Sequence, residues 1–70
     1  MIKLQKARFT WGENLGKAIP ETYTACGGKY HIEKGTIGWN LYEVDQRGYT
    51  EYITTYETLR ELRNDPSLTA

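Results

Sequence analysis

Residues 39–59 read WNLYEVDQRGYTEYITTYETL and hold five of the nine aromatic residues in the chain. Two segments rich in aromatic and β-branched residues, WNLYEV and YTEYI, flank the sequence DQRG, whose aspartate and glycine are typical of a tight turn. The stretch therefore predicts a β-hairpin. One register of this hairpin sets Tyr52 beside Tyr42, and a slip of one residue would turn every side chain of the second strand to the other face of the sheet.

A second hairpin is predicted immediately before the first, over residues 21–34, ETYTACGGKYHIEK. Gly27 and Gly28 can supply the positive φ angles of a two-residue turn. The register that this turn sets places two pairs on one face, Ala25 with Tyr30 and Tyr23 with Ile32. The segment GTIG then makes the turn into Trp39.

The N-terminal segment MIKLQKARFTW predicts a further strand, in which the alternation of apolar and polar residues changes phase near Gln5 and Lys6. A β-bulge is the usual cause of such a change. Residues 11–20, WGENLGKAIP, are predicted to form a loop because their glycines and proline interrupt strand and helix patterns alike.

A C-terminal helix is predicted from the spacing of Thr54 and Glu57. This spacing suits a capping box, in which the hydroxyl and the carboxylate each accept a hydrogen bond from the other residue's backbone amide. Apolar residues follow at helical spacing, and the sequence Asn64-Asp65-Pro66 is expected to end the helix. Residues 66–70 are expected to be a frayed tail.

The predicted fold class is α+β. Residues 1–70 are expected to form a single domain, with a small antiparallel sheet of three to five strands and one C-terminal helix packed on one face. The residues expected between the sheet and the helix are Tyr30, Ile32, Trp39, Leu41, Ile53, Leu59 and Leu62. The single cysteine, Cys26, cannot form an internal disulfide, so aromatic packing or self-association must stabilise this small core.

Composition also predicts the cellular setting. The N-terminal segment carries charges throughout and lacks the apolar run of a signal peptide. No segment approaches the roughly 20 apolar residues of a membrane span. A lone cysteine fits a reducing compartment, so the chain is expected in the cytoplasm with no membrane partner.

Catalysis and cofactor binding are not predicted. The segment GENLGK, residues 12–17, has one residue too few between its glycines for a phosphate-binding loop, and Ala18 stands where that loop needs serine or threonine. Cys26 and His31 are the only thiol and the only imidazole, too few for a structural or a catalytic zinc site. The expectation is a non-enzymatic protein that needs neither metal nor cofactor.

The aromatic surplus predicts a binding surface. A sheet covered by one helix leaves its other face open, and Tyr42, Val44 and Tyr52 are expected there, with Phe9 or Trp11 beside them. Alternatively, the first strand or the loop after it covers that face as a second small core. The residues predicted to bind a protein partner, either another protein or a second copy of the chain, are Tyr42, Val44, Tyr52, Glu43 and Glu51.

A nucleic-acid partner is the alternative function. Residues 1–34 hold six basic and three acidic residues, whereas residues 35–70 hold three basic and six acidic ones. Acidic groups among the tyrosines would repel phosphates, so only the first strand combines cations with aromatic rings as single-stranded nucleic acid requires. The residues of this alternative are Lys3, Lys6, Arg8, Phe9 and Trp11. Protein binding is the preferred prediction.

Residues 30–62, YHIEKGTIGWNLYEVDQRGYTEYITTYETLREL, resemble a pattern found in small, mostly uncharacterised bacteriophage and bacterial accessory proteins. The shared features are a Tyr-x-Ile strand, a Gly-Trp strand, a hairpin and a helix that opens with Thr-Leu-x-Glu-Leu. The resemblance implies an antiparallel sheet with a packed helix, a phage origin and a location in the host cytoplasm. It also implies that the chain binds and blocks a host protein. It defines no active site, so no functional residue carries over.

Overall fold

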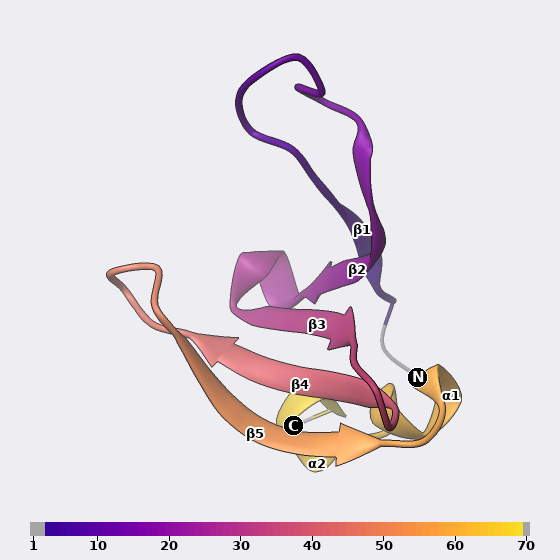
Figure 1. Cartoon of the computed structure of the whole chain (residues 1–70). Helices are drawn as coiled ribbons and strands as arrows, with labels where there is room; N and C mark the ends of the chain where they lie inside the picture. The colour runs from indigo at the N-terminus through magenta and orange to yellow at the C-terminus, as the bar shows by residue number, and fades with distance from the viewer. Residues whose placement is uncertain (1–2, 70) are drawn as a thin grey trace.

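The computed structural model describes residues 3–69, so Ile2 of the predicted first strand and Ala70 of the predicted tail lie outside the described residues. The described chain is mostly strand, and each strand pairs antiparallel with the next in a sheet of order β1-β2-β3-β4-β5 (Figure 1). The strands are β1 (Gln5–Arg8), β2 (Ala18–Ala25), β3 (Tyr30–Lys34), β4 (Trp39–Val44) and β5 (Thr50–Tyr56). Two short helices follow, α1 (Leu59–Leu62) and α2 (Pro66–Thr69). The predicted antiparallel sheet of three to five strands is confirmed.

The hairpin of β2 and β3 has the predicted register. Its pairs include Ala25 with Tyr30 and Tyr23 with Ile32. Gly27 and Gly28 both have positive φ, at 69° and 95°, and the Lys29 N–H donates to the Cys26 carbonyl at 3.4 Å. Cys26 before them also has positive φ, at 53°, and Cys26–Gly28 form a short 3₁₀ turn, η1. Positive φ at both central residues suits the tight turns of hairpins, and glycine adopts it without strain.

The hairpin of β4 and β5 pairs Tyr42 with Tyr52 and Glu43 with Glu51. This is the register that sets Tyr52 beside Tyr42, one of those that the sequence allowed. The Asp45 carboxylate holds its turn by accepting hydrogen bonds from the Arg47 and Tyr49 amides at 2.9 and 3.0 Å. Such side-chain caps on a turn are what aspartate offers at this position.

Ile53 is a correction to the predicted core. Leu41 pairs with Thr54 but Tyr42 pairs with Tyr52, so Ile53 is an extra residue in β5 without a partner in β4. This β-bulge moves the Ile53 side chain out of the alternation, and 37% of it is exposed. The aromatic residue that β5 contributes to the core is Tyr56, which pairs with Trp39 and packs against the buried cluster.

The hairpin of β1 and β2 forms an arm that projects from the sheet (Figure 1). Gln5 pairs with Thr24 and Lys6 with Tyr23, but Arg8 pairs with Ala18, so the irregularity that the sequence places near Gln5 falls between Lys6 and Arg8. Its extra residues lie in β2. Beyond β1, the Phe9 N–H donates to the Lys17 carbonyl and the Gly16 N–H to the Phe9 carbonyl, both at 3.0 Å. The expected loop is therefore shorter than predicted, and residues 18–20 belong to β2.

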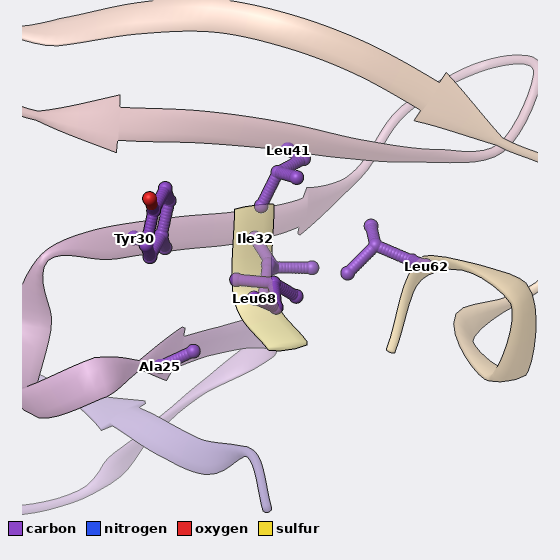
Figure 2. Packing of buried hydrophobic residues seen from close by; sticks show 6 residues of the cluster. All are labelled: Ala25, Tyr30, Ile32, Leu41, Leu62 and Leu68. Carbon is purple, nitrogen blue, oxygen red and sulfur yellow. The ribbon is translucent and has the colours of Figure 1, made fainter. Parts of the chain in front are cut away.

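The core gathers side chains from the strands and from both helices. Ile32, Leu41 and Leu62 are fully buried. Figure 2 shows Leu62 and Leu68 lying beside Ile32 of β3, with Leu41 of β4 next to them. The cluster consists of Ala25, Tyr30, Ile32, Leu41, Leu62 and Leu68, with Leu4, Tyr23, Trp39, Tyr56 and Leu59 partly buried against it.

The C-terminal segment differs from the prediction in two ways. The helix is capped at Thr58, not at Thr54: the Glu61 N–H donates to the Thr58 hydroxyl oxygen at 3.2 Å, and that hydroxyl, rather than the Thr58 backbone amide, donates to the Glu61 carboxylate at 3.0 Å. Thr54 lies in β5, where residues 50–56 favour strand over helix. The expected single helix is replaced by two separate turns of helix, α1 and α2.

The expected frayed tail is the second correction, because residues 66–69 form α2 and bury Leu68. Asp65 explains this order. Its carboxylate accepts a hydrogen bond from the Ser67 N–H at 2.7 Å, as an N-cap does, and another from the Tyr56 hydroxyl. A single buried carboxylate thus ties α2 to the end of β5.

This tie predicts a pH dependence of stability. Partial burial raises the pKa of Asp65, but the hydrogen bonds from Tyr56 and Ser67 outweigh it and hold the pKa below the ordinary value of 3.8. A depressed carboxyl pKa stabilises the fold at neutral pH, and this contribution is lost as the pH falls below about 3.8 towards the folded-state pKa. The hydrogen bond between the Tyr56 hydroxyl and the Asp65 carboxylate also raises the pKa of Tyr56.

Tyr56→Phe tests the tie, because it removes the donor and keeps the ring. We expect it to lower the free energy of unfolding at pH 7 by about 1.5 kcal/mol, the lower end for a hydrogen bond to a charged group. Urea unfolding at pH 7 and at pH 3 should show that the difference from the wild type shrinks at the lower pH. A difference that is equal at both pH values would contradict this role for Asp65.

Candidate functional site

The aromatic residues divide between the two faces of the sheet. Tyr23 and Trp39 lie on the core side, with their ring centroids 5.8 Å apart. His31 and Tyr42 alternate with the buried Ile32 and Leu41, so they lie on the opposite, open face. The open face therefore carries the surplus that the core does not use.

Three rings form a row across the open face, one from each of β3, β4 and β5. His31 pairs with Tyr42 and Tyr42 with Tyr52, and the centroid distances are 6.0 and 5.9 Å. The ring planes are inclined by 51° and 68°, arrangements that aromatic pairs favour. With their polar and apolar neighbours, the rings form what we call the tyrosine face: His31, Asn40, Tyr42, Val44, Tyr52 and Thr55.

A chain of hydrogen bonds holds the outer ring in place. The Thr55 hydroxyl donates to the Asn40 side-chain oxygen at 2.6 Å. Because that donation uses the only hydroxyl hydrogen of Thr55, the Tyr52 hydroxyl must be the donor in its 2.6 Å bond to Thr55. Tyr52 is nevertheless 57% exposed, so a fixed ring faces the solvent.

The centre of the row stays uncharged. Partial burial raises the pKa of the Tyr42 hydroxyl above 10.0, and the nearby Glu33 carboxylate raises it further. Glu33 also lies 3.4 Å from the His31 ring nitrogen Nε2. Tyr42 therefore presents a neutral hydroxyl, a hydrogen-bond donor and acceptor, at physiological pH.

The five residues predicted to bind protein are not all brought together. Tyr42, Val44 and Tyr52 share the open face, but Glu43 and Glu51 alternate with them and pair with each other on the opposite face. Glu43 is also opposite the buried Tyr30. Glu43 and Glu51 therefore do not join the tyrosine face, whereas Glu33 lies beside its His31 and Tyr42.

Phe9 and Trp11 do not join the tyrosine face either, contrary to expectation. They follow β1, which lies at the far edge of the sheet from β5 and is separated from β4 by β2 and β3. The alternative, that the first strand or its loop covers the open face, is also wrong, because the arm projects away from the sheet (Figure 1). Lys6 and Arg8 of β1, with Lys3 just before that strand, line one depression.

Sequence reasoning expected His31 and Asn40 to point outward from their strands but did not include them among the binding residues, and it missed Thr55. The pairing of His31 with Tyr42 could have been found from the register across the GTIG turn between β3 and β4. The contact between Asn40 and Thr55 depends on the bulge at Ile53, which the sequence does not mark.

Other chemistry is limited in the described chain. Within residues 3–69, no group of three or more His, Cys, Asp or Glu side chains is arranged to hold a metal ion. Cys26 is a free, exposed thiol beside the first glycine turn. None of the helices in the described part is long and apolar enough to cross a membrane.

Comparison with known proteins identifies no relative: no protein-family model, no curated protein and no solved structure matches the chain. The resemblance to phage and bacterial accessory proteins therefore rests on residues 30–62 of the sequence alone.

Proposed function

We propose that the chain is a non-enzymatic protein-binding module and that the tyrosine face is its contact surface. The observation that carries the proposal is the row of His31, Tyr42 and Tyr52 on the face opposite the buried core. Tyrosine combines a large apolar ring with a polar tip, and it is enriched among the residues that dominate binding energy at protein interfaces.

The hydrogen bonds of the face favour binding over mere exposure. Because hydrogen bonds through Thr55 and Asn40 already hold the Tyr52 ring in place, little side-chain entropy of Tyr52 would be lost when a partner binds. A standard interface takes about 800 Å² from each partner. The chain exposes 5306 Å² in total, so an interface of that size would cover about 15% of its surface.

The resemblance to small phage and bacterial proteins favours a host protein as the partner, in the host cytoplasm. Such binding would block or modulate the host protein. A second copy of the chain is the other protein partner that the face could accept, and a mass measurement separates the two.

Binding tests use Tyr42→Ala with Tyr49→Ala as the matched control. Tyr49 is 68% exposed in the turn between β4 and β5, so its loss removes an exposed tyrosine without touching the tyrosine face. In a pull-down from bacterial lysate treated with nuclease, we expect the wild type and Tyr49→Ala to capture the same protein. Tyr42→Ala should weaken capture at least roughly 30-fold, the loss expected at a hot spot.

Melting curves of both variants control for unfolding, and Tyr42→Phe, which keeps the ring, should retain most of the binding. Equal capture by Tyr42→Ala and the wild type would overturn the proposal. So would recovery of nucleic acid with no protein from a sample without nuclease.

A further inference from the structure

A second surface lies along β1, at the opposite edge of the sheet from β5. Lys3, Lys6 and Arg8 line one depression there, together with Gln5 and Thr24. No carboxylate is among the described residues that line it. Three cations without an acid stand out in a chain whose formal net charge is zero.

The three cations are available to a ligand. Across residues 3–69, no ion pair engages Lys3, Lys6 or Arg8, and all three are exposed. Arg8 donates one hydrogen bond from Nη1 to the Gly16 carbonyl at 2.8 Å, which leaves other guanidinium donors free and anchors the group at the base of the arm. Glu21 borders a neighbouring depression that is also lined by Lys6.

Beyond these cations, the arm presents an aromatic ring to the solvent. Trp11 is 83% exposed and borders a shallow depression with Phe9, Gly12 and Glu13. The backbone hydrogen bonds from the Phe9 N–H to the Lys17 carbonyl and from the Gly16 N–H to the Phe9 carbonyl order this part of the arm. Trp11 is not a member of the core cluster and does not pack against it.

We infer that this edge binds single-stranded nucleic acid: the three cations contact phosphates, and Trp11 stacks on a base. Proteins that bind single strands combine a positively charged groove with aromatic side chains, because every base offers a flat face. Trp11 lies eight positions after Lys3, so the edge is at most about 28 Å long, enough for several nucleotides. This surface is distinct from the tyrosine face, so a chain can carry both.

A labelled oligothymidylate of 12 nucleotides is the probe, and its fluorescence anisotropy is followed from about 50 to 200 mM salt. Three phosphate contacts on a single strand predict a slope of about −2 in the logarithm of affinity against the logarithm of salt. Lys6→Gln should reduce the magnitude of that slope by about 0.7. Arg47→Gln removes one positive charge from the β4–β5 turn and should leave both slope and affinity unchanged.

Trp11→Ala should weaken binding roughly 5- to 100-fold, the contribution of one stacked base. Tyr42→Ala should leave oligonucleotide binding unchanged, which separates this inference from the proposed function. Melting curves confirm that the variants fold, and Lys6→Arg should keep the wild-type affinity.

Three outcomes would overturn the inference. In the first, Arg47→Gln weakens binding as much as Lys6→Gln, so that only net charge matters. In the second, poly-glutamate of matched charge competes equally well and Trp11→Ala has no effect, so that the surface takes acidic protein segments. In the third, a duplex of the same length binds more tightly than the single strand.

Discussion

Leu62→Ala is expected to lower the free energy of unfolding by about 2–5 kcal/mol and to leave most of the chain unfolded at 37 °C. Leu62 is fully buried and is the residue by which α1 enters the cluster of Ile32 and Leu41. Removing its side chain loses the transfer free energy of the buried atoms and leaves a cavity that the short helix cannot fill. A core of this size rarely supplies more than about 3–5 kcal/mol in total.

Leu59→Ala is the matched control. Leu59 lies in the same turn of helix but is only partly buried against the cluster, so its truncation should cost clearly less. Circular dichroism during thermal and urea unfolding measures both variants. Equal stability of Leu62→Ala and the wild type would contradict the packing of α1 on the sheet.

Gly38→Ala is expected to disrupt the start of β4, with a loss of about 3 kcal/mol or more, at the upper end for forced overpacking. A Cβ atom at Gly38 would lie 2.3 Å from the Tyr56 carbonyl oxygen and 3.2 Å from the Glu57 Cα. These are backbone atoms at the end of β5. They can move only if the two strands separate there.

Gly35→Ala provides the comparison, because it lies in the same turn. There a Cβ would meet the Asn40 side-chain nitrogen at 2.6 Å, and a side-chain end can rotate away. We expect Gly35→Ala to melt close to the wild type and Gly38→Ala to melt far below it. The reverse order would mean that the approach of Tyr56 to Gly38 does not limit the fold.

The register of the β2–β3 hairpin could be predicted because its turn is chemically explicit, whereas the sequence left the register of the β4–β5 hairpin open. Gly27 and Gly28 supply two positive φ angles, and Asp45 caps the second turn. Register then determines which side chains share a face, and so it places Tyr42 beside Tyr52.

The errors have physical causes that the sequence does not show. Ile53 is a β-branched residue in a strand pattern, and only pairing with β4 shows that it is the extra residue. Thr54 and Thr58 each have a glutamate three residues later, so capping alone does not choose between them. Tertiary contacts determine which threonine caps the helix. Strand β5 continues to Tyr56, whose hydroxyl donates to Asp65, so the helix can begin only after Tyr56.

The candidate site was predicted only in part for a similar reason. Successive side chains along β4 point to opposite faces, so Glu43 and Tyr42 lie on different faces although they are neighbours in the sequence. The position of Trp11 depends on the order of strands in the sheet, a long-range property that local patterns do not carry.

Site-specific photo-crosslinking tests most directly the claim that the tyrosine face binds a protein. A photoreactive phenylalanine analogue is placed at Tyr52, which is exposed on that face, and in a second sample at Tyr49, which is exposed in the turn. After irradiation in bacterial lysate, we expect a discrete crosslinked protein from position 52 that is absent from position 49. No product from position 52, or the same products from both positions, would contradict it.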